Sequence, residues 1–248
     1  MTPPAGPLLE LDRVSKRFGQ VVIADEVSLS LRPGDAVGIV GPNGAGKTSL
    51  FGVISGDLAP DAGEVRFGGS PVSGLDPAVR CRLGMGRTYQ VPRPFEHMSV
   101  FENVLVAAQQ GAGARGQASF ELAAEALARS SLEAEANRLA GQLGLLQRKR
   151  LELARALATR PRLLLLDEVA GGLTDPEMVE LVEVIRATRA AGVAVLWIEH
   201  VVRALTAMVD RLVCLAGGRV VADGTPSEVL ASAVVKEVFL GADAGAGP

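Results

Sequence analysis

The sequence predicts an α/β fold in which a mainly parallel sheet carries helices on both faces. Three observations support this. After Gln147 the chain alternates short apolar strands with helical segments, which is typical of parallel sheets. The apolar run Leu163–Leu166 has no polar position, as a strand buried on both faces requires. The region 75–144 lacks strong strand patterns, so we expect a helical lobe inserted into the sheet domain.

The individual elements follow from local patterns of apolar residues and from glycine and proline at the breaks between them. The predicted strands are Leu8–Phe18, Val21–Ile23, Val27–Leu31, Ala36–Val40, Val65–Phe67, Leu163–Leu166, Val193–Ile198, Arg211–Leu215 and Arg219–Ala222. The predicted helices are Thr48–Ser55, Ser119–Leu139, Gln147–Ala158, Pro176–Ala190, Val201–Ala207, Pro226–Leu230 and Val234–Leu240. The tail 242–248 consists of small residues and is expected to be disordered.

Composition and charge argue against several classes of protein. The formal net charge is -3, so the basic excess of a typical nucleic-acid-binding protein is missing and we expect no nucleic-acid partner. Cys81 and Cys214 are too few and too far apart for a zinc site or a disulfide framework, and we expect a reducing compartment. No apolar run approaches the ~20 residues that cross a bilayer, and the first ten residues do not resemble a signal peptide.

Residues 41–48, GPNGAGKT, match the phosphate-binding pattern G-x-x-x-x-G-K-[ST] in full. Glycines let backbone N–H groups curl around phosphate oxygens, and the following helix directs the positive end of its dipole at the same anion. Lys47 is predicted to reach the β- and γ-phosphates, and the Thr48 hydroxyl to ligate Mg²⁺. We therefore predict a P-loop NTPase that binds ATP and Mg²⁺. The predicted nucleotide-binding residues are Gly41, Pro42, Asn43, Gly44, Ala45, Gly46, Lys47, Thr48 and Ser49.

Two acidic residues, Asp167 and Glu168, directly follow the apolar run Leu163–Leu166. Open α/β sheets place their ligands at the carboxyl ends of the strands, which is where these two carboxylates are expected. Asp167 is predicted to hold Mg²⁺, directly or through water. Glu168 is predicted to orient or deprotonate the water that attacks the γ-phosphate.

In combination with four further features, these motifs make the chain resemble the nucleotide-binding subunits of ABC transporters, from about Leu8 to Gly241. The features are Phe18, the segment RTYQ at 87–90, the segment ARAL at 154–157, and His200. The resemblance implies that Phe18 stacks on adenine. It implies that Gln90 contacts Mg²⁺ or the attacking water and reports to a transmembrane partner. It also implies that His200 contacts the γ-phosphate.

The same resemblance implies an ABC ATPase domain at 8–241. Within that domain we expect an N-terminal antiparallel β subdomain and an inserted helical subdomain, roughly 75–144 with a signature helix at 145–159. The segments at 87–103, 150–168 and 238–241 are similar to the ATPases of branched-chain amino acid uptake systems. This implies transmembrane permease subunits as partners, an indirect link to an extracytoplasmic solute-binding protein, and a place on the cytoplasmic face of the inner or plasma membrane.

The family signature, L-S-G-G-Q or L-S-Y-G-Q, is altered in this chain. Counting back from the ARAL segment makes Gln147 the signature glutamine, so that Gly144 replaces the serine and Leu146 the last glycine. In the family, this segment of one ATPase caps the γ-phosphate bound by a second ATPase. Gly144 and Gln147 keep that predicted contact, but Gly144 removes a hydroxyl donor and Leu146 adds bulk. We expect weakened capping and a heterodimer in preference to a homodimer.

Two alternatives stay open at this point. A soluble ABC ATPase of translation or DNA repair usually has two fused ATPase domains or a long coiled coil, whereas this chain has one phosphate loop and no heptad run. A nucleotide-binding regulator without turnover is the other alternative, and the presence of Glu168 and His200 argues against it.

Overall fold

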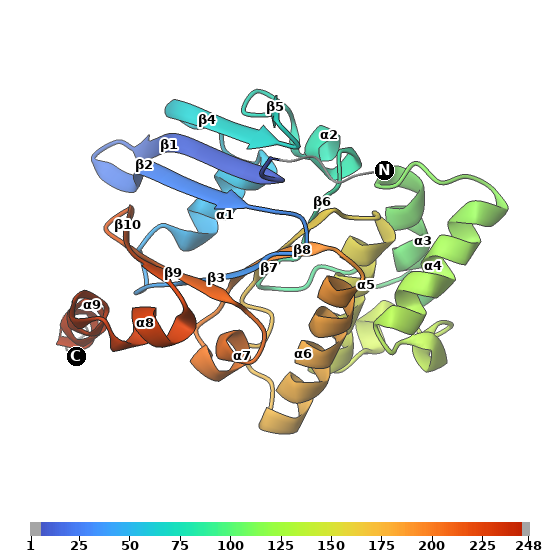
Figure 1. Cartoon of the computed structure of the whole chain (residues 1–248). Helices are drawn as coiled ribbons and strands as arrows, with labels where there is room; N and C mark the ends of the chain where they lie inside the picture. The colour runs from blue at the N-terminus through green and yellow to red at the C-terminus, as the bar shows by residue number, and fades with distance from the viewer. Residues whose placement is uncertain (1–5, 245–248) are drawn as a thin grey trace.

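Two sheets form the frame of the chain in the computed structural model, which describes residues 6–244 (Figure 1). The core sheet has the strand order β10-β9-β3-β8-β7-β6, and every neighbouring pair is parallel except β10 with β9. Its strands are β3 (Ala36–Val40), β6 (Met85–Arg87), β7 (Leu163–Asp167), β8 (Ala194–Ile198), β9 (Arg211–Ala216) and β10 (Arg219–Gly224). The predicted α/β class and mainly parallel core sheet are confirmed.

The second sheet is antiparallel and is built mostly from the N-terminal part of the chain, as expected. Its order is β2-β1-β4-β5, and all of its neighbouring pairs are antiparallel. Its strands are β1 (Leu9–Phe18), β2 (Val21–Leu31), β4 (Ala62–Phe67) and β5 (Ser70–Pro71).

The helices divide into one between the sheets and several on the far face of the core sheet (Figure 1). Helix α1 (Lys47–Ser55) packs with residues of both sheets. The remaining helices are α2 (Pro77–Arg82), α3 (Val100–Gln110), α4 (Gln117–Arg129), α5 (Leu145–Ala158), α6 (Asp175–Ala190), α7 (Val202–Thr206), α8 (Pro226–Ala231) and α9 (Ala233–Ala244). Within the described part of the chain, no helix is both long and apolar enough to cross a membrane.

The burial of strand β7 on both faces explains why its sequence is apolar up to its last residue. Leu163 and Leu165 belong to the cluster around α1, while Leu164 and Leu166 belong to the cluster on the opposite face. All four are fully buried. Because successive side chains of a strand point to opposite faces, a strand between two helical layers needs apolar residues at every position.

Three predicted elements differ clearly from the structure in their boundaries. Val21–Ile23 and Val27–Leu31 are one strand, β2, because the polar break between them is an irregularity in which Glu26 has φ 52° and donates its N–H to Ser15 Oγ. The helix predicted at Ser119–Leu139 ends ten residues early, at Arg129. Ser131 there has φ 53°, a left-handed conformation that stops a helix.

The region 75–144 contains one strand that the sequence did not reveal. Met85–Arg87 forms β6 and pairs with β7 at the edge of the core sheet, so this part of the region belongs to the sheet and not to a helical lobe. The predicted disordered tail at 242–248 overlaps the end of α9 at residues 242–244. Residues 245–248 lie outside the described part.

Candidate functional site

The loop between β3 and α1 can form a phosphate cradle only because it contains glycines. Gly46, with φ 95°, precedes the first residue of α1, and Gly41 has φ 151°. A Cβ at Gly41 would lie 2.0 Å from the Leu215 carbonyl oxygen, and one at Gly46 would lie 2.1 Å from that of Ile23. Any larger residue at either position would push the loop out of this conformation.

Lys47 is the first residue of α1, and its side chain folds over the loop. Its Nζ donates to the carbonyl oxygens of Gly41 at 2.8 Å and Pro42 at 2.9 Å. Burial lowers the pKa of Lys47, and the negative charges of Glu168 and Asp167 oppose that effect. The loop lines a pocket of about 200 Å³ together with Ile23 and Glu168, so a cation and a carboxylate face the same space.

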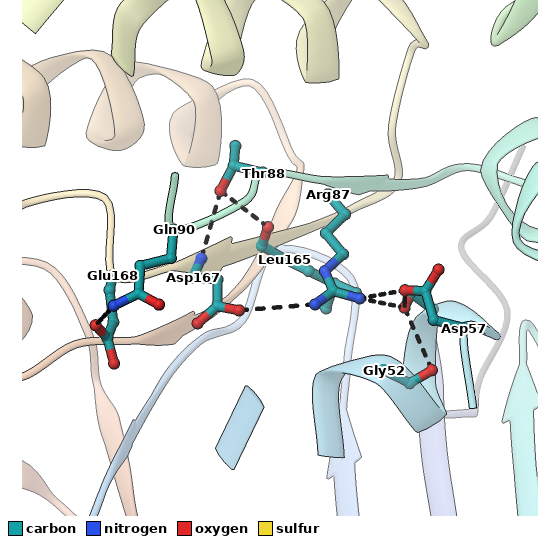
Figure 2. A network of polar contacts seen from close by, with 9 residues as sticks. Gly52, Asp57, Arg87, Thr88, Gln90, Leu165, Asp167 and Glu168 are labelled. Atoms are coloured by element: carbon teal, nitrogen blue, oxygen red, sulfur yellow. Dashed lines mark hydrogen bonds and ion pairs between the residues drawn. The ribbon is translucent and has the colours of Figure 1, made fainter. Parts of the chain in front are cut away.

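Asp167 ends β7 inside the protein, with only 1% of its surface exposed. One oxygen, Oδ2, lies 3.6 Å from Nη2 of Arg87 (Figure 2). The other, Oδ1, is buried and has no hydrogen-bond partner among residues 6–244. Burial raises the pKa of Asp167, while the neighbouring Arg87 charge opposes that effect.

Arg87, at the end of β6, is held from its other side by the end of α1. It forms an ion pair with Asp57 (Figure 2). It also donates to Ser55 Oγ at 2.7 Å, and Ser55 in turn donates to Asp57 at 2.6 Å. Its guanidinium also lies 4.9 Å from the centre of the Tyr89 ring. These contacts fix the arginine beside Asp167.

The side chains around Asp167 fit a magnesium ion. A buried carboxylate oxygen without a partner is costly, and an oxygen-seeking divalent cation would satisfy it. The nearby Thr48 side chain lowers the pKa of Asp167 and so favours its ionised form. The described residues contain no group of three or more His, Cys, Asp and Glu side chains that could hold a metal by themselves. Nucleotide oxygens and water would therefore complete the coordination.

Glu168 is the point where three of the predicted functional residues meet. Its Oε2 accepts a hydrogen bond from the Gln90 amide, and its Oε1 lies 2.6 Å from His200 Nε2 (Figure 2 shows the Gln90 contact). The residues come from three segments: the loop after β6, the end of β7 and the turn after β8. The structure thus brings the predicted catalytic residues Glu168, Gln90 and His200 together at the phosphate pocket.

Thr88 explains how the loop that carries Gln90 reaches Glu168. Its backbone N–H donates to the Leu165 carbonyl at 2.9 Å. Its buried hydroxyl accepts from the Asp167 N–H at 3.3 Å (Figure 2). The chain therefore runs along β7 until two residues before Gln90. The sequence could not predict this contact, because both partners of Thr88 lie on β7 and only the fold brings them together.

Three other predicted residues are not part of this cluster. Phe18 lies at the end of β1, is 50% exposed, and does not line the phosphate pocket. Gly144 and Gln147 lie at the beginning of α5 and do not line it either. Counting back from the ARAL segment predicts this position, at the beginning of the signature helix.

Two buried residues next to the cluster were missed by the motif analysis. Glu199, 1% exposed, accepts backbone hydrogen bonds from Ala170 and His200. Lys149, 5% exposed, donates to the Glu168 carbonyl at 3.3 Å. The sequence did contain a signal for Glu199, which directly follows the apolar strand Val193–Ile198 and precedes His200. A glutamate is seldom fully buried, so its burial at this place is unusual.

Comparison with known proteins agrees with this geometry. Residues 24–171 match the profile of the ABC transporter domain, which covers more than half of the chain. The chain belongs to the ABC transporter family. The ATP-binding subunit predicted from the motifs is therefore confirmed, and so is the enzyme class, an ATP hydrolase.

Several curated members of the family are similar over nearly their whole length. The high-affinity branched-chain amino acid transport ATP-binding protein BraF of Pseudomonas aeruginosa is 35% identical, over 95% of this chain and 98% of BraF. LivG of Salmonella typhimurium, with the same description, is 36% identical at the same coverage. The lipopolysaccharide export system ATP-binding protein LptB of Escherichia coli K12 is 33% identical, over 95% of this chain and 98% of LptB.

Solved ABC cassettes share the fold. The nucleotide-free ATP-binding cassette of an ABC transporter superposes with a TM-score of 0.86 at 29% identity, over 94% of this chain and 99% of that one. The ADP conformation of the cassette MJ1267 gives 0.85 at 30% identity, over 96% of this chain and all of that one. The P-loop NTPase fold of this ABC ATPase is thereby confirmed.

Lys47 provides a direct test of the phosphate cradle in this ABC ATPase. Lys47→Ala should weaken ATP binding about tenfold to a hundredfold, because a hydrogen bond to a charged phosphate is lost. Titration with a fluorescent ATP analogue measures the effect, and Lys236→Ala, which removes an exposed lysine of α9, is the control. Unchanged affinity of the Lys47 variant would exclude the proposed phosphate contact.

Proposed function

We propose that this subunit hydrolyses ATP at Glu168 and so energises the import of branched-chain or related amino acids through separate transmembrane permease subunits. The observation that carries the catalytic part is the Glu168 carboxylate, which is shared between Gln90 and His200 beside the phosphate pocket. The transport part is supported by the similarity to BraF and LivG over 95% of the chain.

Each residue of the cluster has a distinct part in the proposed reaction. Glu168 orients a water molecule toward the γ-phosphate and accepts its proton, while Gln90 and His200 fix the direction of the carboxylate. Lys47 and the backbone N–H groups of the loop hold the β- and γ-phosphates. Mg²⁺, held by Thr48 and Asp167 with help from Gln90, would supply positive charge to the phosphate oxygens. Phe18 would stack on the adenine ring.

Transport requires that ATP binding change how two ATPase subunits associate. We propose that two subunits close head to tail over ATP and that hydrolysis and product release reopen them. ATP can drive this cycle only through different affinities for the closed and open states. The permease subunits would follow that movement and would hold this chain at the cytoplasmic face of the membrane. A solute-binding protein on the other side would act only through them.

Export of a lipid is the second candidate function, because LptB is 33% identical over the same share of the chain. The two candidates differ in the solute and in the partner subunits, and they share the ATPase chemistry. The sequence segments at 87–103 and 150–168 favour the amino acid system.

An ATPase assay of the full-length chain, co-purified with its membrane subunits and solute-binding protein in vesicles, tests the proposal. Branched-chain amino acids should stimulate hydrolysis severalfold. Stimulation by lipopolysaccharide and not by amino acids would favour export.

Glu168→Gln should bind ATP normally but hydrolyse it about a hundredfold more slowly, because the carboxylate that activates water is lost. Near-normal turnover of Glu168→Gln would exclude Glu168 as the base.

The altered signature begins α5 in an open position. Gly144 is the N-cap residue and supplies no side-chain hydrogen bond, and Leu145, the next residue, is 46% exposed. A Cβ at Gly144 would lie 2.7 Å from the Gln147 side-chain oxygen, which a rotation of the flexible Gln147 side chain relieves. We propose that this surface caps ATP poorly and that the chain works best with a second ATPase subunit whose signature is intact.

Restoring the signature tests this asymmetric arrangement. Gly144→Ser together with Leu146→Gly should raise ATP hydrolysis of the purified chain about tenfold to a hundredfold, since a hydrogen bond to the γ-phosphate is regained. Turnover is measured for the chain alone and with its partner ATPase, with Val179→Ala on the exposed face of α6 as the control. If the wild-type chain alone already dimerises with ATP and hydrolyses it at both sites, the asymmetric proposal is wrong.

A further inference from the structure

Glu199 is a buried carboxylate that joins two catalytic segments through the backbone. Its Oε2 accepts from the Ala170 N–H at 2.9 Å, two residues beyond Glu168. Its Oε1 accepts from the N–H groups of His200 at 2.9 Å and Val201 at 3.3 Å. Both oxygens are thus used, one on the segment after β7 and one on the segment after β8.

The backbone that Glu199 holds is strained at the catalytic residue. Glu168 has φ 49°, a left-handed conformation that a residue with a Cβ seldom adopts. Such a conformation persists only where the surroundings fix it from several sides. Here the Glu168 N–H donates to Ile198 O at 2.9 Å, and the Glu199 carboxylate fixes Ala170 just beyond it.

Lys149 connects a third element, helix α5, to the backbone of Glu168. It lies on α5, two residues after Gln147, and its Nζ donates to the Glu168 carbonyl at 3.3 Å. Burial lowers the pKa of Lys149, and the charges of Glu199 and Glu168 oppose that effect. The start of the signature helix is therefore linked to the backbone of Glu168.

We propose that Glu199 is a positioning residue for ATP hydrolysis, and that Lys149 joins the signature helix to the segment that Glu199 holds. By tying Ala170 to His200, Glu199 sets how the Glu168 carboxylate and the His200 ring face each other. Movement at the start of α5, where this chain would contact nucleotide held by a second subunit, would reach Glu168 through Lys149. The inference rests on the proposed roles of Glu168 and His200.

Glu199→Gln is the sharpest variant, because the side chain keeps its size. A glutamine has one acceptor oxygen, so its NH₂ group must face a backbone N–H on one side, and the connection between the two segments opens. We expect kcat of the full-length chain to fall about tenfold to a hundredfold, as for a small misplacement of a catalytic group. KM for ATP should stay within about twofold, because no phosphate contact changes.

Thr188→Val is the matched control. Thr188 is also fully buried, but its hydroxyl donates to the Val184 carbonyl at 2.9 Å within α6, outside the segments 168–172 and 198–202. It should leave kcat unchanged. Because a partly unfolded variant also loses apparent kcat at unchanged KM, kcat is expressed per folded molecule, with the folded fraction taken from a thermal melt. Wild-type kcat for Glu199→Gln, or a rise in KM that accounts for the whole loss, would overturn the proposal.

Hydrogen exchange gives a second readout that needs no turnover. In Glu199→Gln, the amides in at least one of the segments 168–172 and 198–202 should exchange at least about tenfold faster, because the NH₂ group cannot accept from the backbone N–H that it faces. The α1 segment 47–55 should not change. Unchanged exchange in the first two segments would overturn the proposal. The ATPase activity of Glu168→Gln, measured in parallel, tests the role of Glu168 separately. If that variant hydrolysed ATP normally, the proposed role of Glu168 would be wrong, and the exchange result for Glu199→Gln would still hold.

A double-variant cycle tests Lys149. Lys149→Met should lower kcat without raising KM, and combining it with Glu199→Gln should lower kcat no further than the more severe single variant, because both act on the Glu168 segment. Losses that multiply would show that Lys149 acts independently and would overturn the link between α5 and Glu168.

Discussion

The whole site depends on burying strand β7 on both faces. Four consecutive leucines anchor the strand in two apolar clusters, so its end has almost no freedom of position. The two carboxylates that follow are therefore carried to the edge of the sheet where the phosphate loop also begins. Parallel pairing with β6 and β8 then places the segments of Gln90 and His200 on either side of Glu168.

Burial gives the two carboxylates different environments although they are neighbours. Asp167 points inward, beside Arg87, and keeps one oxygen without a protein partner. Glu168 turns outward through a left-handed backbone conformation and has both oxygens in contact with polar side chains. The first environment suits a divalent cation, and the second suits a group that must orient water.

Much of this arrangement could be predicted from the sequence, because it follows from contiguous patterns. Local sequence patterns predict three features: the phosphate loop, the apolar run before Asp167 and the strand at Ala36–Val40. Strand β6 could not be predicted, since three residues are too short to show a period and only pairing with β7 makes them a strand. Helix α3 had a visible signal, the capping box of Ser99 and Glu102, which was overlooked. Contacts such as that of Glu199 with Ala170 join segments far apart in the chain and need the fold itself.

The central claim is that Gln90 and His200 act through one carboxylate, that of Glu168. A double-variant cycle on kcat for ATP hydrolysis tests it most directly, with Gln90→Ala, His200→Ala and the combination of both in the full-length chain. Residues that work through a shared group give strongly non-additive effects. The structure predicts that the double variant loses about as much activity as the more severe single variant, and that neither substitution matters further when Glu168→Gln is present. Losses in kcat that multiply would contradict it.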